Sequence, residues 1–381
     1  MTARAAALRD QGVDVITLSQ GEPDFDTPLA VQEAGIRAIR EGRTRYTAVA
    51  GIKSLREAIR DKLRRDHGLD YAIEAITVGS GAKQVVFNAL YASLDAGDEV
   101  IVPTPCWVSY PDMVALAGGK PVLVPCPERQ GFKLRPEALE AAITPRTKWL
   151  MLNSPSNPTG AVYSSGDLAA LAEVLGRHPQ VHVLTDDIYE KLVYDVRFAT
   201  MAQVASDLFE RVLTVNGVSK TNAMTGWRVG YGAGPLPLIK AMNTIQGQTS
   251  SHTSSISQHA AVEAIAGNQN YIAGFVTDFR QRRDLVVAKL NEAEGLHCRT
   301  PDGAFYAFAS CAGVIGKRTS KGQTIETDTD FSMYLLDQFA VAVVPGSAFM
   351  ASPYIRISYA SSLADLKRAC ERIIAACTAL T

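Results

Sequence analysis

The sequence has no large excess of charge of either sign and no long apolar run. Its 38 Lys and Arg residues nearly balance 39 Asp and Glu residues, which gives a net charge of -1. A near-neutral balance offers no electrostatic surface for nucleic acid, so we expect no nucleic-acid partner. No apolar stretch reaches the length of a membrane-spanning helix, and the first residues show no secretory signal. These absences favour a cytoplasmic enzyme without a membrane partner.

Cysteine is scarce, and its spacing indicates neither a disulfide framework nor a metal site. The six cysteines are scattered and form no Cys-x-x-Cys pair. We therefore expect reduced, mostly buried thiols, which fits the cytosol. His178 and His182 are four residues apart, but Pro179 between them disfavours the helix face that two metal ligands would need. We expect no metal.

The length of the chain, 381 residues, exceeds what one hydrophobic core usually supports, so two domains are expected. Apolar strands that end in polar loops alternate with helical segments, which predicts an α/β fold with a mostly parallel, doubly wound sheet. We expect a large domain over 29–280 and a smaller α+β domain formed by 1–28 together with 281–381. The polar segment 317–329 is predicted as a mobile loop.

The segment from Arg211 to Pro235 holds the strongest signal for a reactive site. An apolar strand, Val212–Val215, leads through a turn to Lys220, and a second apolar strand is predicted over 227–231. An amine at a strand end lies where an α/β fold opens its crevice, and burial there makes it nucleophilic by lowering its pKa. The alternative is a surface lysine after a turn, which is what most lysines are.

The letters SK, followed by TGWR and VGY, resemble the lysine segment of class I aminotransferases, which use pyridoxal phosphate (PLP). The strings GEPDFDTP, WVSYP, NPTG, DDIY and RISYA resemble further signatures of that class. The resemblance runs from Gly12 to the C-terminal helix and is closest to the bacterial aspartate aminotransferase subgroup. It implies fold type I, with a large domain that carries the parallel sheet and a smaller α+β domain.

The resemblance implies a set of contacts to the PLP ring. Lys220 would hold PLP as a Schiff base and move a proton, and Asp186 would keep the pyridine nitrogen protonated. Tyr189 and Asn157 would hydrogen-bond the phenolic oxygen, and Trp107 would stack on the ring. Plainer interpretations stay open: Trp107 as a core residue, Asn157 as a turn former and Asp186 as a helix cap.

A turn of small residues, Gly79–Lys83, opens the helix that follows a predicted strand. Free N–H groups and the helix dipole at such a terminus form a phosphate site, although many turns of this kind look alike. The resemblance assigns the PLP phosphate to Gly81, Ala82 and Arg228, with Lys83 beside them.

Tyr46 would ordinarily be a semi-buried packing residue. In the resembled family the matching tyrosine crosses a dimer interface and donates its hydroxyl to the cofactor phosphate of the neighbouring chain. The resemblance therefore implies a homodimer in which each active site needs both chains.

The substrate side of the site is also assigned by resemblance. Arg356 would grip the substrate α-carboxylate with its planar fork, and the backbone of Gly21 would lie close to that carboxylate. Trp107 and Asn157 would border the substrate. Lys83 would read the distal carboxylate of an acidic substrate, or else point to solvent or support the phosphate.

These assignments predict an aminotransferase that moves an amino group between an L-amino acid and a 2-oxo acid such as 2-oxoglutarate. Aspartate is the expected donor, with aromatic amino acids and prephenate or arogenate as further candidates. The alternatives are a PLP-dependent β-lyase, another fold type I enzyme, or a ligand-sensing regulator, for which no DNA-binding segment precedes Gly12. Gly217 stands where other relatives carry a phosphate-binding serine, and the N-terminal arm of the subgroup is missing or has been removed, so substrate preference stays open.

Overall fold

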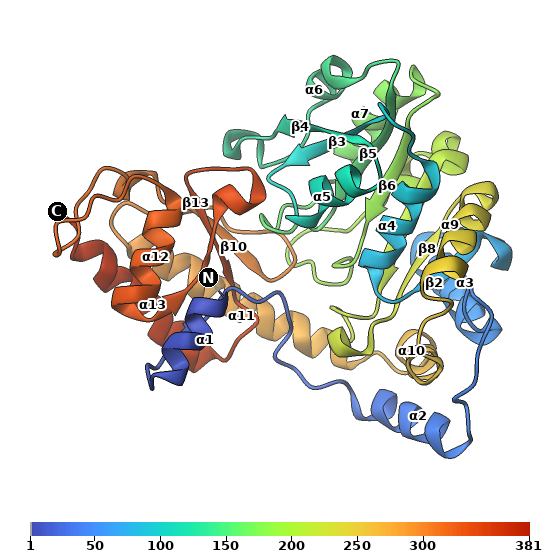
Figure 1. The fold of residues 1–381 in the computed structure, drawn as a ribbon, viewed down its shortest axis with the longest axis horizontal. Helices are drawn as coiled ribbons and strands as arrows, with labels where there is room; N and C mark the ends of the chain where they lie inside the picture. The colour runs from blue at the N-terminus through green and yellow to red at the C-terminus, as the bar shows by residue number, and fades with distance from the viewer. Residues whose placement is uncertain (1) are drawn as a thin grey trace.

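The computed structural model describes residues 2–381 and contains two regions, each built around its own sheet (Figure 1). The larger region holds a seven-stranded sheet of order β2-β8-β7-β6-β5-β3-β4. Four neighbouring pairs are parallel, and β8 runs antiparallel to both β7 and β2. The prediction of a mostly parallel sheet is confirmed. The strands are β2 Ile76–Gly79, β3 Glu99–Thr104, β4 Lys120–Pro125, β5 Thr147–Asn153, β6 His182–Asp186, β7 Val212–Gly217 and β8 Gly230–Ala233.

Helices cover both faces of this sheet because successive strand residues point to opposite sides. Leu150 and Leu152 of β5 belong to the core beneath α3, α6, α7, α8 and α10, whereas Met151 packs on the other face with α4, α5 and α9. The sheet is thus doubly wound, as predicted. The helices of this region are α2 Leu29–Arg40, α3 Lys53–His67, α4 Ala82–Ser93, α5 Ser109–Leu116, α6 Pro136–Ala142, α7 Ser165–Gly176, α8 Met201–Val204, α9 Leu236–Thr249 and α10 Ser255–Ala266.

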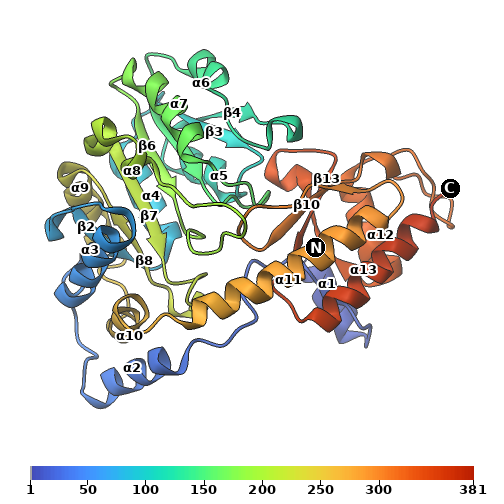
Figure 2. The ribbon, with the colours of Figure 1, turned by 180° about the vertical axis from the view of Figure 1, so that it is seen from behind.

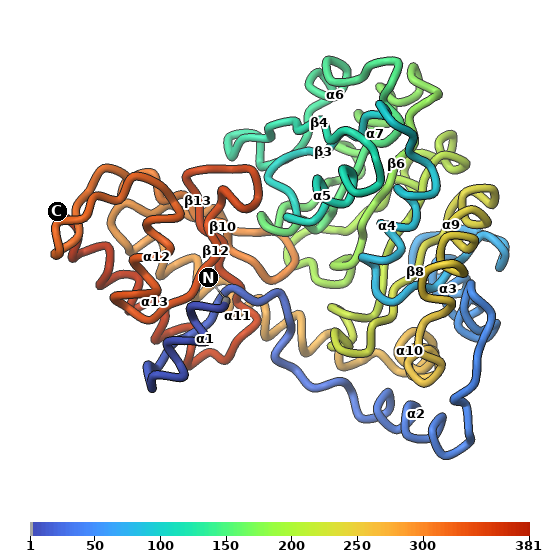
Figure 3. The backbone as a smooth tube through the Cα atoms, in the orientation of Figure 1, coloured from blue at the N-terminus to red at the C-terminus, as the bar shows by residue number. Residues whose placement is uncertain are grey.

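The smaller region is built on a four-stranded antiparallel sheet of order β12-β13-β10-β9. Beside it, β1 near the start of the chain pairs in parallel with β11. The N-terminal helix therefore lies with the C-terminal helices, as the backbone trace shows (Figure 3). The elements are α1 Thr2–Asp10, β1 Ile16–Thr17, β9 His297–Cys298, β10 Tyr306–Ser310, α12 Asp328–Phe339, β11 Val341–Ala342, β12 Val344–Pro345, β13 Tyr354–Ser358 and α13 Leu363–Thr378.

One long helix, α11 (Tyr271–Glu292), runs from the larger region into the smaller one, which Figure 2 shows from behind. The predicted boundary at residue 280 lies inside this continuous helix, so the division into 29–280 and the remainder stays a proposal. No helix in residues 2–381 combines the length and apolarity that crossing a membrane requires. The six cysteines, all within this range, are buried and unpaired, as expected.

Two local predictions differ from the structure. The segment 227–231 was expected to be a strand, but β8 begins only at Gly230, after a 3-10 turn and a left-handed residue, Arg228, with φ 55°. The left-handed backbone of Arg228 interrupts the extended conformation that a strand starting at residue 227 would need. The expected loop over 317–329 is instead a short turn with a bridge between Arg318 and Thr324, and α12 starts before the segment ends.

Candidate active site

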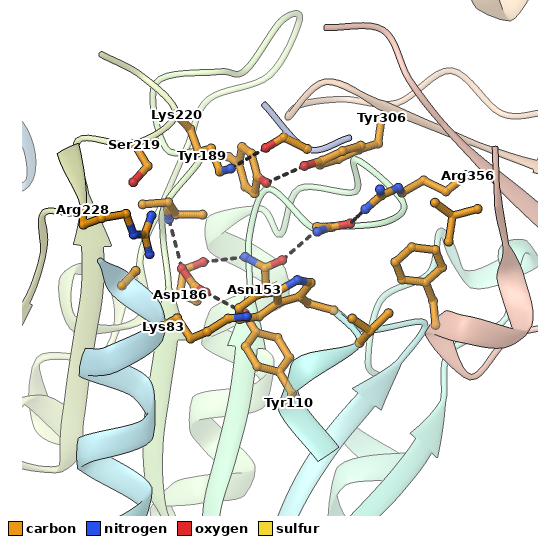
Figure 4. A pocket seen from close by; sticks show the side chains of 18 residues that line it. Lys83, Tyr110, Asn153, Asp186, Tyr189, Ser219, Lys220, Arg228, Tyr306 and Arg356 are labelled. Carbon is orange, nitrogen blue, oxygen red and sulfur yellow. Dashed lines mark hydrogen bonds between the residues drawn. The ribbon is translucent and has the colours of Figure 1, made fainter. Parts of the chain in front are cut away.

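A cavity of about 480 Å³ opens between the two regions, where β5, β6 and β7 end (Figure 4). It brings together every residue predicted for the site except Gly81 and Tyr46. The predicted residues that line it are Gly21, Ala82, Lys83, Trp107, Asn157, Asp186, Tyr189, Lys220, Arg228 and Arg356. This convergence follows from topology, since the carboxyl ends of parallel strands meet at one edge of the sheet.

Lys220 lies three residues beyond the end of β7, and its amine donates a hydrogen bond to the carbonyl oxygen of Gly21. Burial lowers the pKa of this amine to about 8, and the nearby guanidinium groups of Arg228 and Arg356 act in the same direction. About a tenth of the amine is therefore neutral at pH 7, far more than for an ordinary lysine. Such an amine can act both as a nucleophile and as a proton acceptor.

Asp186 is the last residue of β6 and is almost fully buried. Its Oδ2 accepts a hydrogen bond of 2.7 Å from the hydroxyl of Tyr110, and the backbone N–H of Ile188 donates to Oδ1 at 3.3 Å. Burial raises the pKa of this carboxyl to about 6, while the bond from Tyr110 opposes that rise. The carboxylate is thus ionised near neutral pH and can stabilise a buried N–H donor.

Sequence reasoning gave no role to Tyr110 or to Asn153, whose side-chain amide donates to the Asp186 carbonyl at 2.7 Å. A signal existed for Tyr110, because it lies three residues after Trp107 at a helix start, a spacing that places two side chains on one face. Asn153 is the last residue of β5, opposite Asp186 in the register of β6. Its position at a strand end was the available signal.

Tyr306 of β10 was also missed. Its hydroxyl lies 2.8 Å from the hydroxyl of Tyr189, and a Cβ at Gly21 would come within 2.4 Å of it. Position 21 must therefore be glycine for the first segment of the chain to pass over Tyr306. No local pattern relates these two residues, since one precedes the larger region and the other follows it.

Arg356 on β13 enters the cavity from the opposite side. Its guanidinium donates to Asn157 Oδ1 at 2.9 Å and to the carbonyl oxygen of Ser19 at 2.6 Å, and it stacks over the ring of Tyr306 at 4.5 Å. Its Nε is buried without a partner, and none of the salt bridges within residues 2–381 involves this arginine. Burial lowers its pKa. A buried cation of this kind is suited to an anionic ligand.

The other end of the cavity forms a second anion site. Helix α4 begins at Ala82 with Gly81 as its N-cap, no side chain caps it, and its first N–H groups have no partner within the helix. Gly81 has a φ of 89°, a backbone conformation that favours glycine, and the guanidinium of Arg228 lies against it. Gly81 thus shapes the site without lining the cavity. Ser219, which was not predicted, adds a hydroxyl to the lining.

Lys83 and Trp107 face each other across one wall of the cavity. The Lys83 amine lies 4.6 Å from the centre of the Trp107 ring and borders the cavity, while the residue as a whole is exposed to solvent. Trp107 in turn packs edge-on against Tyr110. The geometry of Lys83 is compatible with a role at the substrate carboxylate and with a role at the cofactor phosphate.

Tyr46 and Gly217 lie outside the cavity. Tyr46 is 92% exposed and packs edge-on against His252, so the structure of one chain does not place it at the site. Its role at the phosphate of a partner chain stays a prediction. Gly217 is buried in β7, where a Cβ would lie 2.9 Å from the carbonyl oxygen of Val229. The close approach of β7 and β8 therefore explains why a serine is absent at this position.

The sequence pattern of the family Aminotransferase class I and II matches residues 13–373. The chain belongs to this family of transaminases, and the predicted resemblance and fold type I are confirmed. Aminotransferase activity is accordingly favoured over the β-lyase alternative.

Among its relatives, the aspartate aminotransferase of Rhizobium meliloti (strain 1021) is 57% identical over 380 residues, which cover 100% of this chain and 93% of that protein. The aspartate/prephenate aminotransferase of Cereibacter sphaeroides is 54% identical, with 100% and 96% covered. The crystal structure of the R. meliloti aspartate aminotransferase superposes with a TM-score of 0.98 at 57% identity, covering 100% and 95%. The Thermus thermophilus aspartate aminotransferase with maleate superposes with a TM-score of 0.90 at 44% identity, covering 98% and 95%.

Proposed function

We propose that this protein is a PLP-dependent aspartate aminotransferase that passes the amino group of aspartate to a 2-oxo acid such as 2-oxoglutarate. The observation that carries the proposal is the buried Lys220 amine, which shares one cavity with the Asp186 carboxylate and lies between two cationic ends. PLP needs an amine, a carboxylate and a phosphate cradle in one pocket, and these groups supply them.

The residues present fit the cofactor. The N-terminus of α4 and Arg228 would hold its phosphate, Lys220 its aldehyde carbon, Asp186 its ring nitrogen, and Tyr189 and Asn157 its phenolic oxygen. When bound, PLP supplies an electron sink that stabilises negative charge at the Cα of an amino acid. Trp107 would cover one face of the ring and keep water from it.

The chain's own groups then have distinct tasks. The Lys220 Nζ would accept the proton from the substrate Cα, which suits an amine whose pKa is about 8. The Asp186 carboxylate holds a proton on the ring nitrogen by offering it a buried negative charge. Arg356 binds the α-carboxylate and so fixes which bond of the Cα faces Lys220.

The preference for aspartate is supported by Lys83, the lysine nearest the wall formed by Trp107, and by the relatives. Proteins at 54–57% identity are named for aspartate or for aspartate and prephenate. The Thermus structure was solved with maleate, a dicarboxylate. A substrate with two carboxylates would place one on Arg356 and the other near Lys83, so both anions would meet a cation.

We further propose a homodimer with shared active sites in the cytoplasm. Tyr46 is almost fully exposed. In the helix that precedes it, α2, Leu29 and Ile39 are 70% and 55% exposed. Apolar side chains exposed together favour a protein interface. The partner chain would cover them and bring its own Tyr46 to the phosphate.

The test is a coupled assay of the PLP-loaded protein with aspartate and 2-oxoglutarate, combined with borohydride reduction and peptide mapping. The proposal expects oxaloacetate and glutamate in equal amounts and the pyridoxyl label on Lys220. Release of pyruvate and ammonia without an amino acid product would instead establish a lyase. A label on Lys83 would overturn the assignment of the reactive amine.

A further inference from the structure

A buried cluster of charged residues lies behind the turn that carries Asp186 and Tyr189. The carboxylate of Glu190 is ion-paired with the amine of Lys62, and its Oε2 lies 2.7 Å from Nε2 of His67. Lys62 and His67 both belong to α3, so one helix holds both oxygens of this carboxylate. The side chains of Lys62, His67 and Glu190 are 5%, 8% and 6% exposed, which makes the cluster inaccessible to solvent.

A second ion pair continues the cluster. Asp66 of α3 lies 2.7 Å from the amine of Lys191, which directly follows Glu190, and 3.8 Å from the amine of Lys62. Burial by itself raises the pKa of Glu190, but the charges and hydrogen bonds of Lys62 and His67 outweigh it and lower that pKa to about 2. Glu190 is therefore ionised near neutral pH, and two side chains of α3 hold its carboxylate.

Glu190 and Tyr189 are neighbours in one tight turn, but their side chains make contacts on opposite sides of it. Tyr189 lines the active-site cavity, where its hydroxyl meets that of Tyr306 (Figure 4). The turn is closed by a backbone hydrogen bond of 2.9 Å from the Glu190 N–H to the Asp187 carbonyl oxygen. Tyr189 lies within this hydrogen-bonded turn, and the Glu190 side chain attaches the same turn to α3.

Stability alone does not account for this cluster. Replacing a buried ion pair by apolar residues of similar size is often neutral or stabilising, because taking charges out of water is costly. An ion pair, unlike an apolar contact, fixes the direction in which two side chains meet. Here the attachment joins α3, whose Leu55, Ile59 and Leu63 are fully buried in the core, to the turn at the end of β6.

We propose that Glu190 is a positioning residue, held by Lys62 and His67, which fixes the Tyr189 hydroxyl in the active site. The inference rests on the proposed function, because the hydroxyl of Tyr189 matters to the reaction only if PLP occupies the cavity. We expect substitution of Glu190 to change activity by displacing Tyr189 and not by destabilising the fold.

The experiment compares Glu190→Gln, Tyr189→Phe and the double variant. Glu190→Gln should lower kcat about tenfold, because the Tyr189 hydroxyl would no longer be held in place. It should also shift the pKa seen in the absorbance of bound PLP in the same direction as Tyr189→Phe. In the double variant the loss should equal that of Tyr189→Phe alone, since both changes act on one group. Losses that multiply would overturn the proposal.

Glu99→Gln is the matched control. Glu99 is also a buried acid with two cationic partners, Lys120 and Arg146, but it lies at the start of β3, at the sheet edge opposite the cavity. The control should leave kcat and the PLP absorbance unchanged. If it changes both as much as Glu190→Gln does, loss of a buried charge anywhere explains the result and the proposal fails.

A measurement without cofactor separates this inference from the proposed function. In the apo protein, Glu190→Gln should speed hydrogen exchange at the amides of 187–192, while Glu99→Gln should not. Unchanged exchange there would overturn the role of Glu190 whatever the activity. Conversely, a wild-type protein that transaminates nothing would refute the proposed function, and the exchange data would still decide whether Glu190 holds the turn.

If Glu190→Gln fails to fold because Lys62 is left unpaired, the pair can be removed together as Lys62→Met with Glu190→Met. This variant buries no unpaired member of the pair and should fold. We expect it to show the same loss of kcat and the same faster exchange. Wild-type values for both would show that the attachment is dispensable and would contradict the proposal.

Discussion

The two ends of the active-site cavity are built in different ways. At the cofactor end, three neighbouring strands of one sheet supply the groups. Asn153 ends β5, Asp186 ends β6, and Lys220 follows β7, so the register of the sheet sets their spacing. At the substrate end, Arg356 comes from β13 of the smaller region, and its hydrogen-bond partners belong to other parts of the chain.

This difference separates chemistry from recognition. The cofactor end keeps its geometry as long as the seven-stranded sheet is intact, because strand pairing fixes it. The substrate end depends on how the smaller region meets the larger one, since Asn157 and Ser19 hold Arg356 from outside its own sheet. Changes at the cofactor end should therefore alter kcat for every substrate, whereas changes at the substrate end should alter affinity or selectivity.

The largest effect is expected at the cofactor end. Lys220→Ala removes the amine that moves the proton, so transamination should fall by at least about 10⁴-fold while the protein stays folded. Single-turnover kinetics would measure the rate of transamination, and circular dichroism would show whether the protein is folded. Lys240→Ala, which changes an exposed lysine on α9, serves as the control and should be fully active. Substantial activity without Lys220 would mean that another amine does the chemistry.

Arg356→Lys tests the substrate end. Lysine keeps the charge but loses the planar fork, so KM should rise roughly ten- to a hundredfold for every substrate, equivalent to about 1.5–3 kcal/mol. The control is Arg368→Lys, since Arg368 is half exposed and forms ion pairs with Asp14 and Asp365. A rise confined to one class of substrate would show that Arg356 reads the side chain and not the α-carboxylate.

Lys83 lies on the wall between the two ends, and Lys83→Ser decides to which end it belongs. If it reads a distal carboxylate, kcat/KM for aspartate and glutamate should fall about tenfold, and the values for phenylalanine and tyrosine should hold or rise. A panel of these four donors measures it. Equal losses on all four would assign Lys83 to the cofactor end.

Tyr110→Phe should give the smallest effect near pH 8 and a larger one in acid. The Tyr110 hydroxyl stabilises ionised Asp186, so its loss raises the pKa of Asp186 further above about 6. The acid limb of the kcat/KM profile should move to higher pH by about 1 to 2 units, because a hydrogen bond to a charged group contributes about 1.5–3 kcal/mol. An unmoved acid limb would show that Asp186 does not set it.

The sequence alone was enough to locate the cofactor end. Lys220, Asp186 and Asn157 each follow an apolar strand, and polar groups after parallel strands must gather at one edge, so local patterns carry global information there. The turn of small residues before a predicted helix likewise indicated Gly81. Their roles remain predictions for the experiments above.

What only the tertiary structure decided are the contacts between segments far apart in the chain. Tyr306 meets Tyr189 and Gly21, Arg356 meets Ser19, and Glu190 meets Lys62, although nothing in the local spacing of these residues relates them. The antiparallel direction of β8 and its late start at Gly230 also escaped the pattern of apolar residues. Such features depend on how closely backbones and side chains pack in three dimensions, and hydrophobic periodicity records only which face of an element is buried.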